Sequence, residues 1–192
     1  MSVLGELQPN KVFKYFEEIC SIPHGSRNLQ QISDYLVDFA KAHELKYRQD
    51  EDLNVIIWKD GSKGYEASEP VILQGHMDMV AVKEADCDKN MEKEGLDLEI
   101  NGDYISAKGT SLGGDDGIAV AYTLAVLDDE EMAHPPIEAI FTVNEEIGML
   151  GAATIDVSDL KGRLFMNMDS EDEGVFTVSC AGGASVICKI PY

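Results

Sequence analysis

The stretch Val71-Ile-Leu-Gln-Gly-His-Met-Asp-Met-Val80 joins an apolar run to a histidine and an aspartate two residues apart. A short, β-branched apolar run predicts a buried strand, so His76 and Asp78 would follow at its carboxyl end. In open α/β sheets these ends border the crevice in which ligands bind. Taken alone, such a pair is more often just a loop that follows a strand, and the rest of the chain has to decide.

Helices and strands are predicted to alternate around this stretch. Helical spacing of apolar residues indicates a helix between Pro9 and Pro23, and a second helix that Ser26 caps. Residues 117–127 are apolar almost all round and predict a helix buried on most sides. Strands are expected at 54–58, 70–74, 137–143 and 162–169, with a hairpin at 98–107 that turns at Asn101-Gly102. The pattern predicts a layered α/β domain with a largely parallel sheet.

Composition argues against several classes of protein. With 192 residues, 44% of them hydrophobic, the chain can bury the core of one domain or of one and a part. Its net charge of -21 repels phosphate backbones and anionic lipids, so we expect no nucleic-acid or membrane partner. No apolar run reaches membrane-spanning length and no signal peptide stands at the N-terminus, which predicts a cytoplasmic protein. Four scattered cysteines without a CxxC pair predict reduced thiols.

Three more acidic sites follow strand or loop signals. Asp115 and Asp116 follow two glycines, Glu145 and Glu146 follow one predicted strand, and Asp169 follows another. Each has a simpler explanation, as a helix cap, a surface helix start or a loop carboxylate. However, adjacent carboxylates are costly to desolvate without a cation between them. The recurrence in four segments of one predicted sheet therefore favours a metal site.

The ordered motifs H-M-D, G-G-D-D-G, N-E-E-I-G and N-M-D-S-E resemble those of the dizinc peptidase superfamily, which includes carboxypeptidases, aminoacylases and tripeptidases. Within it, EICSIPHGS, LQGHMDMV, GTSLGGDDGIAVA and EEIGMLGA most resemble the aminoacyl-histidine dipeptidases (Xaa-His dipeptidase, peptidase D). The resemblance covers essentially the whole chain. It implies a three-layer α/β domain of the zinc-exopeptidase type, with a mostly parallel central sheet that is incomplete in this chain.

The resemblance also implies a ligand set for two zinc ions, which cobalt or manganese can replace. His76 and Asp169 would hold one ion, Glu146 would hold the other, and Asp115 would bridge them. Oxygen and imidazole ligands suit these metals. The peptide bond between Asp115 and Asp116 is expected to be cis.

Two further residues would act in catalysis rather than as ligands. Asp78 would orient His76, and Glu145 would be the general base. The chain departs from the closest dipeptidases at Asp116, where they usually have asparagine.

The function that the resemblance implies is hydrolysis of small dipeptides of the Xaa-His kind by a metallopeptidase. Alternatives are a tripeptidase, an N-acyl amino acid deacylase, or a non-catalytic α/β binding module. Residues 1–180 would be the N-terminal part of the catalytic domain, and residues 181–192 would begin a second lid or dimerisation domain. The resemblance also implies a histidine ligand from far downstream. No histidine follows His134, so we expect residues 1–192 alone to be inactive. Separately, a homodimer is the expected assembly of the full-length enzyme.

Overall fold

A five-stranded mixed sheet forms the centre of the molecule. The computed structural model describes residues 2–170, 174–179, 182–183 and 186–190. The strands are β1 (Lys46–Gln49), β2 (Val55–Lys59), β3 (Val71–His76), β6 (Ile137–Thr142) and β7 (Leu164–Asn167), in the order β1-β2-β6-β3-β7. Strands β6, β3 and β7 are parallel, and β2 is antiparallel to both β1 and β6. The predicted α/β class and the mostly parallel sheet are confirmed.

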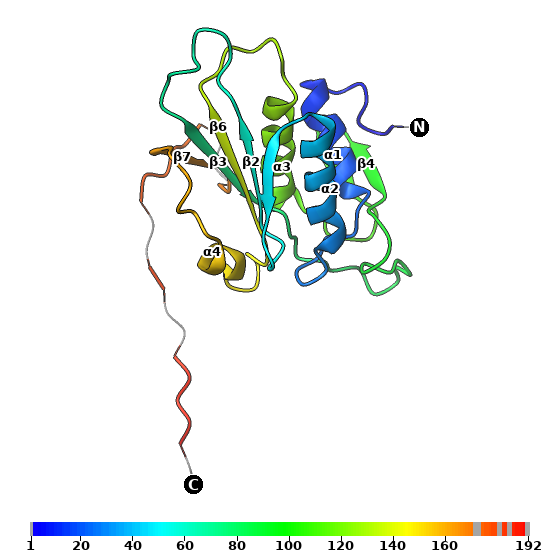
Figure 1. Cartoon of the computed structure of the whole chain (residues 1–192). Coiled ribbons are helices and arrows are strands. Elements are labelled where there is room, and N and C mark those ends of the chain that lie inside the picture. The colour runs from blue at the N-terminus through cyan, green and yellow to red at the C-terminus, as the bar shows by residue number, and fades with distance from the viewer. Residues whose placement is uncertain (1, 171–173, 180–181, 184–185, 191–192) are drawn as a thin grey trace.

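Three helices pack together beside this sheet (Figure 1). They are α1 (Asn10–Cys20), α2 (Gln30–Ala42) and α3 (Gly114–Leu127), and the five-residue α4 (Leu150–Thr154) lies apart from them. Helix α3 is apolar on nearly every side because α1 and β3 pack against it. The core contains Phe16 of α1, Leu36 of α2, Leu124 of α3 and Phe141 of β6, each at most 2% exposed. No helix in the described part of the chain is long and apolar enough to cross a bilayer.

The hairpin forms a separate two-stranded sheet of β4 (Leu98–Asn101) and β5 (Tyr104–Ala107). The predicted position of its turn, Asn101-Gly102, is wrong by one residue. Asn101 pairs with Tyr104, so the two loop residues are Gly102 and Asp103. Gly102 takes the positive φ of 63° that this tight turn needs, and glycine adopts it without steric cost.

Ser26 does not cap α2, contrary to the prediction. The residue before that helix is Leu29, and it forms no side-chain cap. The Ser26 hydroxyl donates instead to the Asp78 carboxylate, at 2.7 Å. A tertiary contact across 52 residues of sequence has replaced the local one, and it brings the loop before α2 to the end of β3.

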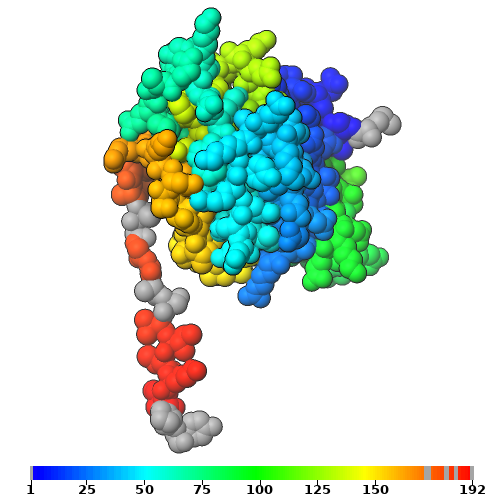
Figure 2. Space-filling view, viewed as in Figure 1, coloured from blue at the N-terminus to red at the C-terminus, as the bar shows by residue number. Residues whose placement is uncertain are grey.

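The last part of the chain contains neither helix nor strand in the residues that are described. Residues 174–179, 182–183 and 186–190 leave the body as an extended segment (Figures 1 and 2). The predicted start of a second domain at 181–192 falls partly on residues 181, 184–185 and 191–192, which lie outside the described residues. The domain boundary therefore stays a prediction.

Candidate metal centre

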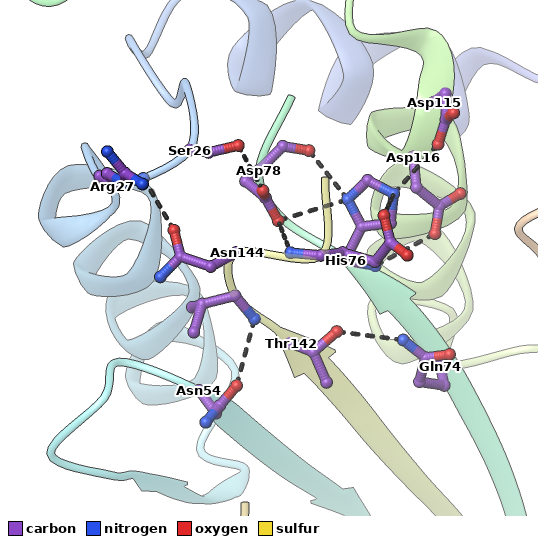
Figure 3. A network of polar contacts seen from close by, with 12 residues as sticks. Ser26, Arg27, Asn54, Gln74, His76, Asp78, Asp115, Asp116, Thr142 and Asn144 are labelled. Atoms are coloured by element: carbon purple, nitrogen blue, oxygen red, sulfur yellow. Dashed lines mark hydrogen bonds and ion pairs between the residues drawn. The ribbon is translucent and has the colours of Figure 1, made fainter. Parts of the chain in front are cut away.

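His76 ends β3, and its ring is the centre of the polar cluster in Figure 3. The side chain is 1% exposed, its Nδ1 lies 2.9 Å from the Asp78 carbonyl oxygen, and its Nε2 lies 3.0 Å from Asp115 Oδ1. Because a carbonyl oxygen only accepts, Nδ1 carries a proton. The other ring nitrogen, Nε2, faces the acids, and Glu145 Oε2 lies 3.8 Å from it.

Asp78 contacts His76 mainly through its backbone carbonyl, whereas an aspartate that orients a ligand histidine often does so through its carboxylate. The backbone carbonyl of Asp78 makes the short contact, whereas its carboxylate Oδ1 lies 3.5 Å from His76 Nδ1. That carboxylate accepts hydrogen bonds from the Ser26 hydroxyl at 2.7 Å and the Glu145 backbone N–H at 2.9 Å. Asp78 thus connects three segments that are distant in sequence.

Asp115 and Asp116 occupy a non-helical start of α3. Gly113 has a φ of 68°, and the Asp115–Asp116 peptide is cis, as the family resemblance implied. The two side chains diverge: that of Asp115 is 69% exposed and faces His76, whereas Asp116 is buried and its Oδ2 accepts the His76 backbone N–H at 3.1 Å. Only a glycine at position 75 leaves room for Asp116, since a Cβ there would stand 2.9 Å from Oδ2.

Glu145 and Glu146 follow β6 after a sharp change of direction. Asn144 has a positive φ of 53°, and its side-chain oxygen accepts the Arg27 backbone N–H at 2.8 Å. Glu145 is then fixed through its own backbone N–H on Asp78. Both glutamates are only partly buried. The carboxylates of both lie close to the His76 ring, at the same edge of the sheet.

Burial and crowding of acids perturb the pKa values in this cluster. Burial by itself lowers the pKa of His76, but the hydrogen bond with Asp78 and the negative charges of Asp116 and Asp78 outweigh it and raise the pKa to about 9. Burial raises the pKa of Asp116 to about 7. The pKa values of Glu145 and Glu146 are also raised, by burial first and by neighbouring acids next.

Three predicted ligands converge in the structure and the fourth does not. The ligand atoms of His76, Asp115 and Glu146 lie within 4.8 Å of one another. Asp169 is exposed, outside this group, and its backbone N–H contacts Asn167 Oδ1 at 3.2 Å. Its charge nevertheless raises the pKa values of Asp116 and Glu145, so it faces the same region.

The cluster fits a divalent cation. Among the described residues, no lysine or arginine forms an ion pair with Asp115, Asp116, Glu145 or Glu146, and His76 is within ion-pair distance of Asp115 and Glu145 only. One imidazole and two carboxylates form a donor set that zinc and related metals accept. Sequence reasoning did not find Ser26, Asn144 or Gly75 as parts of this site, because their roles depend on long-range contacts.

The chain is similar in sequence and in fold to known peptidases. No family model matches the chain. It is 40% identical over 183 residues to the cytosol non-specific dipeptidase of Escherichia coli K12, covering 95% of this chain and 38% of that protein. An aminoacylhistidine dipeptidase from Vibrio alginolyticus superposes with a TM-score of 0.86 at 40% identity, covering 89% of this chain and 35% of the other. A Staphylococcus aureus tripeptidase shares the fold, with a TM-score of 0.71 at 23% identity, over 88% of this chain and 45% of the other.

These matches define the fold as the α/β fold of the dipeptidase and tripeptidase structures. More narrowly, the predicted resemblance is confirmed at 40% identity, to a non-specific dipeptidase in one comparison and to an aminoacylhistidine dipeptidase in the other. The chain spans little more than a third of the length of these two relatives.

Proposed function

We propose that this chain carries metal ligands and the general base of a metallopeptidase that hydrolyses dipeptides of the Xaa-His kind. The observation that carries the proposal is the convergence of His76, Asp115 and Glu146 within 4.8 Å, with Glu145 beside them. The identity to two dipeptidases supports the choice of substrate class.

His76, Asp115 and Glu146 would hold metal, and Asp169 would join them from the segment after β7. Two zinc ions, when bound, lower the pKa of water and polarise the scissile carbonyl. Glu145 accepts the proton of the attacking water, a role for which a partly buried carboxylate with a raised pKa is suited. Asp78 keeps the imidazole of His76 and the backbone of Glu145 in place.

A cavity bordered by the Ser26 loop, rather than by the proposed ligands, is large enough for a short peptide. Its volume is about 890 Å³, and its lining includes Ser26, which is hydrogen-bonded to Asp78. Its charged lining residues are four basic ones and two acidic ones, Arg27, Lys83, Lys89 and Lys93 with Asp88 and Glu92, although the chain as a whole carries a net charge of -21. A cationic lining suits the carboxylate end of a short peptide. A cytosolic location agrees with the name of the E. coli relative and is part of the proposal.

Hydrolysis assays with a panel of dipeptides, tripeptides and N-acyl amino acids test the proposal, with and without added zinc, on the full-length protein. We expect zinc-dependent release of histidine from Xaa-His dipeptides. Faster turnover of tripeptides or N-acyl amino acids would instead support one of those alternatives. Bound metal without any turnover would identify a binding module.

Glu145→Gln separates the base from the ligands. We expect the variant to keep the metal content of the wild type and to lose turnover by about 10²–10⁴-fold, because a general base is removed and no ligand is. Asp115→Ala is the matched comparison, and it should lose metal. Equal loss of metal in both variants would show that base and ligand are exchanged. The expected inactivity of residues 1–192 alone stays a prediction that the same assay checks.

A further inference from the structure

The two carboxylate oxygens of Asp78 have different partners. Oδ1 accepts the Glu145 backbone N–H at 2.9 Å and lies 3.5 Å from His76 Nδ1. Among the hydrogen bonds of the described residues, Oδ2 has one donor, the Ser26 hydroxyl at 2.7 Å. The carboxylate is buried, so each of these contacts replaces a hydrogen bond to water. Ser26 therefore holds one of the two carboxylate oxygens, and the Glu145 N–H holds the other.

The loop that carries Ser26 is held in place by its backbone. The Met79 N–H donates to His24 O and the Ser26 N–H donates to Met79 O, both at 3.2 Å, so the loop runs parallel to the segment after β3. Gly25 permits this approach, since a Cβ there would stand 2.6 Å from the Ala81 Cβ. Removing the Ser26 hydroxyl leaves all of these contacts in place.

The next residue connects the same loop to the end of β6. The Arg27 N–H donates to Asn144 Oδ1 at 2.8 Å, and Arg27 has a positive φ of 72°. Asn144 directly precedes Glu145. The loop thus contacts the segment after β3 through Ser26 and the segment after β6 through Arg27, as Figure 3 shows.

We propose that Ser26 is a positioning residue for the metal centre, acting through the Asp78 carboxylate on both His76 and the Glu145 backbone. The importance of this role for metal binding rests on the proposed function, whereas the role in geometry does not. Without its donor, the buried Oδ2 is left unsatisfied, and the carboxylate turns toward other donors. That rotation disturbs the contacts of Oδ1, which are those to Glu145 and His76.

The test uses residues 1–192 as the wild type and as the variants Ser26→Ala, Ser26→Thr and Ser106→Ala. Ser26→Thr keeps the hydroxyl. Ser106→Ala is the matched control, because the Ser106 hydroxyl also donates to a carboxylate, that of Glu99, but within the β4–β5 hairpin. Thermal unfolding of each variant verifies that it is folded.

The first readout is the NMR spectrum of the metal-free protein. In Ser26→Ala we expect the Glu145 amide and the His76 ring nitrogens to shift, and in Ser26→Thr and Ser106→Ala we expect them to stay near wild-type positions. Unchanged Glu145 and His76 signals in a folded Ser26→Ala variant would overturn the proposal, whether or not the protein binds metal.

The second readout is Co²⁺ affinity, measured by titration of the visible absorption. Loss of a residue that supports a metal ligand typically weakens binding 10–100-fold. Because Ser26 acts through Asp78, we expect a loss of about tenfold in Ser26→Ala, recovery in Ser26→Thr and no change in Ser106→Ala. Wild-type affinity in Ser26→Ala would overturn the proposed effect on the metal. A wild-type chain that binds no Co²⁺ would count against the proposed function, while the NMR comparison would still decide the role of Ser26.

Discussion

Gly75→Ala should destabilise the protein, although it adds a single methyl group. The new Cβ would stand 2.9 Å from Asp116 Oδ2 and 3.1 Å from the Ala119 Cβ. Neither neighbour moves freely, because Asp116 is buried and bonded to the His76 N–H, and Ala119 belongs to α3. Overpacking of this kind costs about 1–3 kcal/mol. For a domain of this size, that corresponds to a fall in Tm of roughly 2–12 °C.

Gly117→Ala is the matched control for this prediction. Gly117 lies in α3, and a Cβ there would meet the nearest atom, Phe16 Cε2, at 3.4 Å, an ordinary contact. Alanine also has the higher helix propensity, by about 1 kcal/mol. Urea denaturation followed by circular dichroism should therefore show a loss of stability in Gly75→Ala and none in Gly117→Ala. Equal stability of the two variants would refute the close packing of Asp116 against β3.

Three other predictions concern parts of the chain outside the ligand set. Strand β7 pairs only with β3 among the described residues, and Phe165 on it is 56% exposed, so we expect this edge to pair with a second copy of the chain. Phe165→Lys should reduce that self-association in size-exclusion chromatography, and unchanged association would contradict the role of this edge. Asn54→Ala should cost about 1–3 kcal/mol in denaturant unfolding, because it leaves the buried Val143 N–H without its acceptor; a neutral effect would contradict this. Burial raises the pKa of Glu17, but hydrogen bonds from Ser2 and from two backbone N–H groups outweigh burial, so the pKa is lowered overall. The ionised Glu17 side chain should therefore stabilise the fold at pH 7, and this contribution should be lost as the pH falls below about 4.5. Glu17→Gln should remove that part of the pH dependence, and an unchanged acid limb of the stability profile would count against it.

The sequence predicted the elements that have a clear apolar or turn pattern and missed two short ones, β1 and α4. Helices α1, α2 and α3 have a periodic or continuous apolar pattern, and their positions were predicted. Strand β1 has the sequence Lys-Tyr-Arg-Gln and lies at an edge, so it lacks the alternation that indicates a strand. Helix α4 has five residues, too few for a helical period to appear.

The sequence indicated which residues form the candidate site, but it did not indicate how they contact one another. His76, Asp115 and Glu146 converge because each follows a strand or a tight turn at the same edge of the sheet, a relation that the sequence pattern indicates. The hydrogen bond of Ser26 to Asp78 joins positions 52 residues apart, and local propensity favoured a helix cap in its place. The position of Asp169 outside the cluster likewise depends on the path of the chain after β7.

An anomalous X-ray diffraction map of zinc-soaked crystals tests the central claim most directly. We predict a peak at the zinc absorption edge bounded by His76 Nε2, Asp115 and Glu146, and its disappearance in crystals of Asp115→Ala. A map of the wild-type protein with no peak among these three side chains, or with zinc bound only at other residues, would contradict the account.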